Sequence, residues 1–161
     1  PRSTQSRSSA ASDVYKRQVI DHIPAGRALD VLKILHLTGK EGLTIAIVMN
    51  VSSKKLGRKD IVKVEGRFLE PIEVDEIALI APTATINIVK EFNVVEKRKV
   101  QVPGEIVGLL RCPNPSCVTN SKREPIATRF RIVSPSPLRL KCHYCEELVS
   151  EEQILRQLVG E

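Results

Sequence analysis

The 161-residue sequence has no tryptophan, one methionine and only 3% aromatic residues. A core with so few rings must depend on Val, Ile and Leu side chains. No apolar run approaches the roughly 20 residues that a transmembrane helix needs, and no apolar signal segment opens the chain. We therefore expect a cytoplasmic protein with no membrane partner, of a length that fits one ordinary domain or two small ones.

Short motifs that mark common catalytic sites are also missing. There is no Walker-type Gly-Lys-Ser/Thr loop and no Gly-x-Ser-x-Gly elbow, and Gly57-Arg58-Lys59-Asp60 is no phosphate-transfer motif. We therefore expect no catalytic residues and a protein that is not an enzyme.

The four cysteines lie in the last third of the chain as two close pairs. Cys112 and Cys117 stand in Arg-Cys-Pro-Asn-Pro-Ser-Cys, and Cys142 and Cys145 stand in Lys-Cys-His-Tyr-Cys. Two such knuckles, separated by roughly 25 residues, bring four thiolates to the corners of a tetrahedron around zinc. Two disulfides or four free buried thiols are the alternatives. We predict one structural Zn²⁺, whose closed ligand shell leaves no position for a catalytic water.

The net charge of +6 is unevenly placed along the chain. Half of this net charge belongs to the first 18 residues, which contain four basic residues and one acidic residue. Four thiolates around one dication subtract two further charges from the rest. The folded body is then close to neutral, which argues against a nucleic-acid partner.

Residues 1–18 lack apolar periodicity and cannot bury enough surface to order themselves. The stretch from Ser8 to Gln18 also resembles translated adapter read-through at the ends of assembled sequencing contigs. We therefore expect residues 1–18 to be a disordered or non-native tail.

From Val19 onward, the apolar pattern predicts regular elements. They are a helix after Pro24 that stops at Thr38-Gly39, a hairpin of Leu43 to Val51 with Lys59 to Val64, a helix between Pro71 and Pro82, and one or two strands over Thr85 to Val89 and Phe92 to Val95. With a missing strand supplied before Val19, the order is βαββαβ, a ferredoxin-like unit.

The last third of the chain predicts a small antiparallel β module over the metal, so that the whole chain is of the α+β class. Its strands are expected over Ile106 to Leu110, Arg129 to Val133 and Leu138 to Lys141. Ser150 and Gln153 form a capping box for a short final helix, whose apolar side must dock on this chain or on a partner.

Four segments in order carry a resemblance to a known family. They are Val19-Ile20-Asp21-His22-Ile23-Pro24-Ala25, Gly57-Arg58-Lys59-Asp60, Ala81-Pro82-Thr83-Ala84-Thr85-Ile86-Asn87 and the two cysteine knuckles. In order and spacing they resemble the regulatory chain of aspartate carbamoyltransferase. The likeness covers Val19 to about Leu158.

The resemblance implies a non-catalytic subunit of pyrimidine biosynthesis. Residues 19–100 would bind the nucleoside triphosphates CTP and ATP as allosteric effectors, residues 101–105 would be a linker, and residues 106–161 would be the zinc domain that docks on the catalytic chain. A homodimer of regulatory chains within a larger hetero-oligomer is also implied. By position, the nucleotide residues are Asp21, His22, Lys59, Lys63, Asn87, Val89, Phe92, Val94 and Lys97.

Elementary chemistry supports part of this set. Lys59 and Lys63 are four residues apart on a predicted strand, so both side chains share one face and can converge on a polyphosphate. Lys97 adds a third cation, and Asn87 offers both a donor and an acceptor to a base edge. The plain alternatives are a solvated lysine face, a polar strand residue at Asn87, and a helix-entry cap at Asp21 and His22. His36 and His143 are expected to be structural.

One departure from the family pattern concerns the base pocket. The expected first strand is matched only superficially by residues 14–18, because the Gly-Thr that precedes the Val in the family is absent. Loss of a central strand would expose backbone groups on two neighbours. The sequence therefore predicts a weakened or absent base pocket.

Basic residues flank the cysteine knuckles, and their role is open. Arg111, Arg139 and Lys141 either offset the anionic thiolates or pair with acidic groups of the catalytic chain. A zinc-ribbon nucleic-acid-binding module is the alternative function. It would use the same cysteines, but it would carry a more basic surface and more stacking aromatic rings than Tyr144 and three phenylalanines supply.

Overall fold

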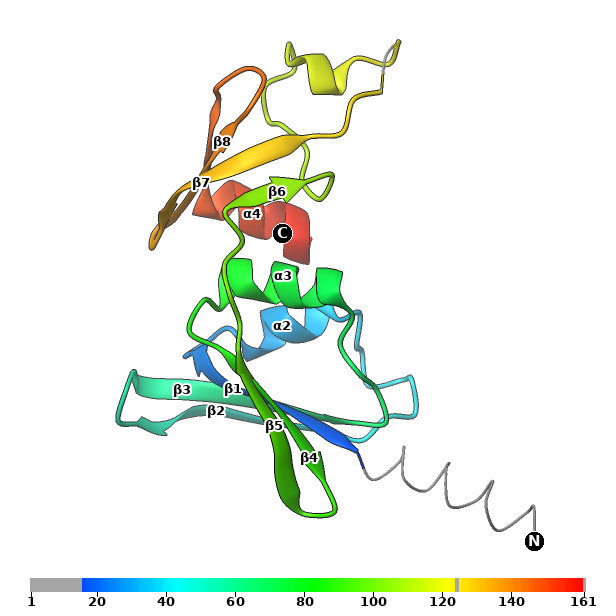
Figure 1. Ribbon diagram of the computed structural model, residues 1–161, viewed down its shortest axis with the longest axis vertical. Helices are drawn as coiled ribbons and strands as arrows, with labels where there is room; N and C mark the ends of the chain where they lie inside the picture. The colour runs from blue at the N-terminus through cyan, green and yellow to red at the C-terminus, as the bar shows by residue number, and fades with distance from the viewer. Residues whose placement is uncertain (1–15, 124, 161) are drawn as a thin grey trace, which may run out of the picture. The chain divides into compact units, whose positions relative to one another are not determined.

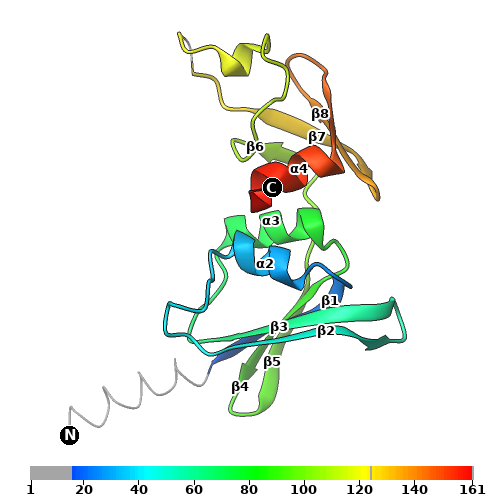
Figure 2. The same cartoon turned by 180° about the vertical axis from the view of Figure 1, so that it is seen from behind.

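The computed structural model describes residues 16–123 and 125–160. The chain divides between Gln101 and Val102 into two compact units, each with its own sheet (Figures 1 and 2). None of the helices in the described ranges is long and apolar enough to cross a membrane.

The first unit is a five-stranded antiparallel sheet with two helices on one face (Figure 1). In chain order its elements are β1 (Arg17–Pro24), α2 (Ala28–Ile34), β2 (Ile45–Ser53), β3 (Gly57–Glu65), α3 (Pro71–Ile80), β4 (Thr85–Lys90) and β5 (Asn93–Lys99). The strand order is β2-β3-β1-β4-β5. Its first four strands have the ferredoxin-like order, and β5 adds a further strand beside β4.

The expectation that a strand is missing before Val19 is wrong. Val19 and the residues after it form β1 itself, which lies between β3 and β4 and pairs antiparallel with both. Arg17 and Gln18, which the sequence assigned to the tail, are the first residues of this strand. Residues 1–15 of that predicted tail lie outside the described residues.

Alternation along the strands separates a buried face from an open face. Gln18, Ile20 and Ile23 of β1 are buried, as are Val62 and Val64 of β3, and these side chains form the core with the helices. The open face is lined by the residues between them, and it carries the polar side chains discussed below.

Asp60 is a buried anchor for the start of α2. Its side chain is fully buried, and its carboxylate accepts hydrogen bonds from the backbone N–H groups of Gly26, Ala28 and Asn50 at 2.8 to 3.0 Å. Because α2 has no side-chain cap at its own N-cap residue, this carboxylate from β3 satisfies donors that the helix leaves free.

The second helix follows the sequence expectation closely. Pro71 occupies the first turn, and Glu70 and Glu73 form a capping box. The helix ends at Ile80, two residues before Pro82, because a residue before proline is driven out of the helical region.

The second unit is a four-stranded antiparallel sheet with one helix. Its strands, in the order β6-β7-β8-β9, are β6 (Glu105–Val107), β7 (Arg129–Pro135), β8 (Leu138–Cys142) and β9 (Leu148–Ser150), and they are accompanied by the 3₁₀ turn η1 (Val118–Asn120) and by α4 (Glu151–Val159). The strand predicted over Ile106 to Leu110 is shorter, because Gly108 turns the chain with a φ of 73°. β9 was not predicted.

The final helix α4 docks on its own unit. Ser150 and Gln153 form the predicted capping box, and Gly160 ends the helix with a left-handed φ of 78°. Ile154 is fully buried against the sheet core, where Phe130, Leu140 and Val149 are also buried. Among the described residues, the apolar side of this helix therefore packs on its own unit.

Candidate functional site

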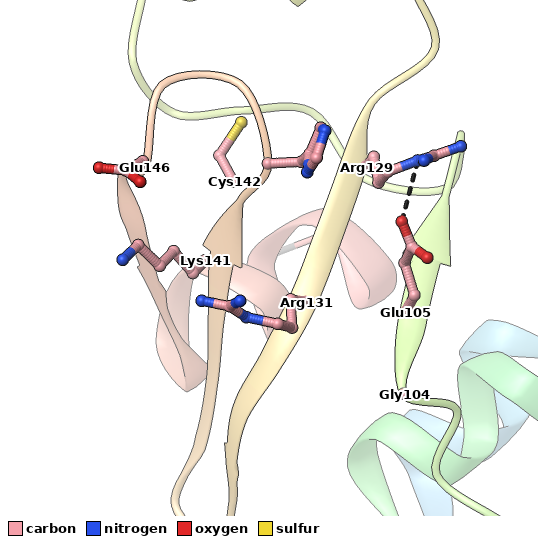
Figure 3. A pocket seen from close by; sticks show the side chains of 8 residues that line it. Gly104, Glu105, Arg129, Arg131, Lys141, Cys142 and Glu146 are labelled. Carbon is pink, nitrogen blue, oxygen red and sulfur yellow. Dashed lines mark ion pairs between the residues drawn. The ribbon is translucent and has the colours of Figure 1, made fainter.

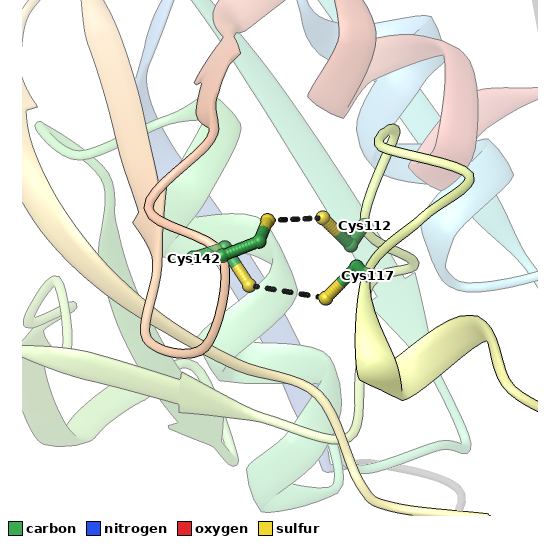
Figure 4. Close-up of side chains that lie close together, drawn as sticks. Cys112, Cys117 and Cys142 are labelled. Atoms are coloured by element: carbon green, nitrogen blue, oxygen red, sulfur yellow. Dashed lines mark hydrogen bonds between the residues drawn. The ribbon is translucent and has the colours of Figure 1, made fainter.

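The four cysteines of the second unit form one cluster. Their sulfur atoms all lie within 4.8 Å of one another, with Cys112 Sγ 3.4 Å from Cys145 Sγ and Cys117 Sγ 3.8 Å from Cys142 Sγ (Figure 4). A disulfide would bring two sulfurs to about 2.05 Å, so all four are free thiols. A tetrahedral site with Zn–S bonds of about 2.3 Å needs sulfurs about 3.8 Å apart. The cluster fits a metal ion of this size.

The two knuckles are built differently. Cys142 ends β8, and its backbone N–H donates to the carbonyl of Glu147 at 2.9 Å, so the second knuckle belongs to the β8–β9 hairpin. The first knuckle is an irregular loop, where Asn120 Nδ2 donates to the carbonyls of Cys112 and Asn114 at 3.0 and 2.6 Å.

Thiol acidity differs within the cluster. Burial raises the pKa of Cys112 and of Cys142. Burial acts in the same direction on Cys117, but hydrogen bonds from Thr119 and the neighbouring thiols outweigh it and lower the pKa of Cys117 to about 7. The Thr119 hydroxyl lies 3.2 Å from Cys117 Sγ. Thiolate is the form that binds metal, so a cation would be needed to hold the sulfurs of Cys112 and Cys142 ionised near neutral pH.

The open face of the five-stranded sheet gathers most of the predicted nucleotide residues. In one row across four strands, Lys63 of β3 lies beside Val19 of β1, Val19 beside Asn87 of β4, and Asn87 beside Lys97 of β5. Two cations therefore flank an apolar and an amide position. The face therefore has cations at both sides and an apolar side chain beside an amide at its centre, which suits a flat polar ring and an anionic chain.

Asp21 and Lys59 occupy the same open face near the end of β1. Lys59 Nζ lies 2.9 Å from Asp21 Oδ1. A β-bulge between Ile20 and Ile23 gives His22 a positive φ of 57°, and its ring Nδ1 lies 3.1 Å from the hydroxyl of Thr85. This bulge sets Asp21 and His22 beside each other at one end of the face.

The remaining predicted nucleotide residues lie at and near the β4–β5 turn. Val89 and Val94 are cross-strand partners. Phe92 lies in the turn with a positive φ of 67° and 86% of its surface exposed, and the Arg17 guanidinium lies 5.4 Å from its ring centroid. Val89 and Val94 are therefore paired residues of the sheet, whereas Phe92 belongs to the exposed turn at its edge.

Asn87 carries an unsatisfied acceptor. Its side-chain Oδ1 is buried and has no hydrogen-bond partner in the part of the chain that the structure describes. A buried polar atom without a partner costs about 1–3 kcal/mol. It marks the centre of the open face as a place where a ligand donor would be stabilised.

A basic groove lies on the open face of the second sheet (Figure 3). It has a volume of about 710 Å³ and is lined by Gly104, Glu105, Arg129, Arg131, Lys141, Cys142, His143 and Glu146. Glu105 pairs with Arg129 at 2.9 Å, but Arg131 and Lys141 make no ion pair with any described residue. Two cations are thus available to a partner.

Sequence reasoning found some of this groove and missed the rest. Lys141 lies in it, and Arg139 lies on the same strand, two residues away. Arg129 and Arg131 were missed, although their spacing of two on a predicted strand is a signal for a shared face. Arg111 instead has both backbone polar groups bonded to Gln157. His143 lines the groove and packs edge-on against Tyr144.

The fold and the cysteine cluster together define a two-unit α+β protein with a metal-binding module. Residues 11–101 match the family model described as the allosteric domain of the aspartate carbamoyltransferase regulatory chain, and residues 104–155 match that of its metal binding domain. The chain therefore belongs to the family of aspartate carbamoyltransferase regulatory chains.

Individual relatives give the same result. The regulatory chain of Thermofilum pendens is 71% identical over 142 residues, which cover 88% of this chain and 89% of the relative. That of Hyperthermus butylicus is 65% identical over 140 residues, covering 87% and 88%, and that of Korarchaeum cryptofilum is 59% identical over 142 residues, covering 88% and 90%. The zinc-ribbon nucleic-acid alternative is not needed to explain the cysteines.

Proposed function

We propose that this chain is a non-catalytic regulatory subunit in pyrimidine biosynthesis, which binds CTP and ATP on the open face of its first unit and docks on the catalytic chain through a zinc-containing second unit. The observation that carries the nucleotide part is the row of Lys63, Val19, Asn87 and Lys97 across four strands, with an unsatisfied buried oxygen at Asn87.

Different residues of the open face contact the phosphates, the base and the ribose of the nucleotide. Lys63 and Lys97 supply cations for the phosphates. The free Oδ1 of Asn87 accepts a hydrogen bond from an exocyclic amine, which both cytosine and adenine carry. Asp21 accepts from ribose hydroxyls when Lys59 turns toward a phosphate.

The weakened base pocket predicted from the sequence loses one of its two reasons. The prediction rested on the absence of the family's Gly-Thr and on the loss of the central strand, and β1 is present with Val19 at the centre of the open face. We therefore propose that the base side of the face is complete, and calorimetric titration with CTP and with ATP measures whether it is.

The donor set supports zinc as the metal. Four thiolates in tetrahedral spacing are the ligands of structural zinc sites, and Cys112, Cys117, Cys142 and Cys145 would hold the ion. When bound, it supplies a cross-link between the two knuckles. Because all four positions are filled by sulfur, we propose a structural and not a catalytic role.

The groove of the second unit supports docking on a partner. Arg131 and Lys141 are free to pair with acidic side chains of the catalytic chain. The sequence raised this role for Lys141, and the strand register adds Arg131. We further propose that two regulatory chains pair with each other, as the family resemblance implies, and sedimentation of the purified chain tests this pairing.

The decisive experiment mixes the zinc-loaded chain with isolated catalytic trimers. Carbamoyl transfer is measured with and without CTP or ATP, and complex formation is followed by sedimentation. A coupling free energy of about 1–3 kcal/mol would change the apparent affinity for substrate by roughly 5- to 150-fold. Absence of both a complex and a kinetic effect would refute the proposed function.

A further inference from the structure

The side-chain amide of Gln157 makes two hydrogen bonds to one residue of the first knuckle. The backbone N–H of Arg111 donates to Gln157 Oε1 at 2.7 Å, and Gln157 Nε2 donates to the carbonyl of Arg111 at 2.8 Å. The amide thus satisfies both backbone polar groups of Arg111, as a paired residue on a neighbouring β-strand would. Arg111 directly precedes the metal ligand Cys112.

This contact bridges two elements that are otherwise separate. The first knuckle lies outside the four-stranded sheet, and the side-chain hydrogen bonds of Asn114, Thr119 and Asn120 within it are local ones. Just before the knuckle, the carbonyl of Leu110 accepts a hydrogen bond from the Thr128 hydroxyl. Gln157 instead belongs to α4, which is fixed at both ends by its capping box and by Gly160. The helix is fixed in its middle by Ile154, three residues before Gln157 and fully buried.

We propose that Gln157 is a positioning residue for the metal centre, holding the first knuckle so that Cys112 meets the second knuckle. The second knuckle is already shaped by the β8–β9 hairpin, so the first is the half whose placement needs support. This inference rests on the zinc site of the proposed function and is independent of nucleotide binding.

The consequence is reciprocal coupling between α4 and metal retention. If Gln157 favours the metal-binding arrangement, a bound metal must in turn stabilise the position of α4. Removing the amide is expected to speed zinc loss about tenfold, at the lower end of the effect known for groups that orient metal ligands.

The test uses the full chain loaded with zinc and a chromophoric chelator in excess. Gln157→Ala is compared with wild type and with Arg156→Ala, a control on the same helix that breaks only the exposed ion pair of Arg156 with Glu152. Zinc release about tenfold faster in Gln157→Ala alone is the expected result. Equal release rates in all three, or equal acceleration in both variants, would overturn the proposal.

Two further measurements separate positioning from general destabilisation. Gln157→Glu keeps an acceptor for the Arg111 N–H but loses the donor to its carbonyl, so it should also release zinc faster even if Gln157→Ala fails to fold. In Gln157→Glu with zinc bound, the amide hydrogens of α4 should exchange faster than in zinc-bound wild type, while those of β7 and β8 exchange at the wild-type rate. A wild type that binds no zinc would instead refute the zinc part of the proposed function.

Discussion

Lys59 Nζ lies 2.9 Å from Asp21 Oδ1 on the open face of the first sheet, and this pair sets the ionisation of the carboxylate. Burial opposes the charge, but hydrogen bonds from Lys59 and from the His22 backbone N–H outweigh burial and lower the pKa of Asp21. The pair therefore contributes stability above the unfolded pKa of about 3.9, and this contribution is lost as pH falls through the folded pKa.

Replacing the lysine tests that relationship. In Lys59→Met we expect the pKa of Asp21 to rise, because burial remains while the main opposing hydrogen bond is gone. Carbon-13 NMR of the Asp21 carboxyl measures the midpoint directly. Lys63→Met serves as a control, since Lys63 pairs with Glu65 and not with Asp21. Identical midpoints in wild type and Lys59→Met would contradict the assignment.

The lysine row predicts the salt dependence of nucleotide binding. Lys63→Ala and Lys97→Ala should each weaken CTP and ATP about tenfold, because each removes one charge-assisted contact to phosphate. Calorimetry at two salt concentrations measures the loss and its screening. Lys55→Ala, in the β2–β3 turn, should bind as wild type does. Comparable weakening by Lys55→Ala would mean that only the overall charge matters.

Metal removal is expected to affect the two units unequally. Structural zinc contributes on the order of 10–16 kcal/mol to small modules, so chelation should unfold the second unit, whereas the first unit keeps its own core. Two-dimensional NMR of the full chain resolves both. Cys142→Ser should give the same pattern without a chelator. Persistence of the second unit's signals after zinc removal would show that the metal is dispensable for folding.

The basic groove predicts a charge-reversal effect on assembly. Arg131→Glu should weaken association with the catalytic chain, with a larger loss at low salt, because it places a negative charge in a groove that we propose faces acidic groups. Lys122→Glu changes the same charge on an exposed loop outside the groove. Sedimentation with catalytic trimers compares them, and equal binding by Arg131→Glu and wild type would remove the groove from the interface.

Asp60 predicts a stability effect without a ligand. Asp60→Ala leaves the N–H groups of Gly26, Ala28 and Asn50 without their acceptor. At roughly 1–3 kcal/mol for each group, the first unit should lose about 3 kcal/mol or more of unfolding free energy. Asp60→Asn keeps one acceptor oxygen and should lose less. Urea unfolding measures both, and a neutral Asp60→Ala would mean that water replaces the carboxylate.

Features governed by local chemistry were predictable from the sequence. Pro71 and Pro82 delimit α3, Ser150 and Gln153 cap α4, and the spacing of the cysteines gives the metal cluster. The helix ends depend on residues close together in the chain. The two cysteine pairs lie 25 residues apart, but each pair is local and the thiol side chain itself indicates a metal ligand, so one sequence is enough to predict the cluster.

Features that depend on pairing between distant residues were not predictable from the sequence. The first strand was expected before Val19 and thought to be lost because residues 14–18 lack the family's Gly-Thr. Only the pairing of β1 with β3 and β4 shows that Val19 itself lies in the central strand. β9 has three residues, too few for a visible alternation, and it exists through its pairing with β8. The two hydrogen bonds of Gln157 join residues 46 apart.

The central position of β1 also decides how far the N-terminus can be shortened in the laboratory. Arg17 and Gln18 pair with Glu65 and Val64 of β3 on one side and with Val89 and Ile88 of β4 on the other. Trimming the chain to Val19 would therefore remove backbone pairing with both neighbouring strands. A truncated version for expression should therefore start upstream of Arg17, even if residues 17 and 18 are not native.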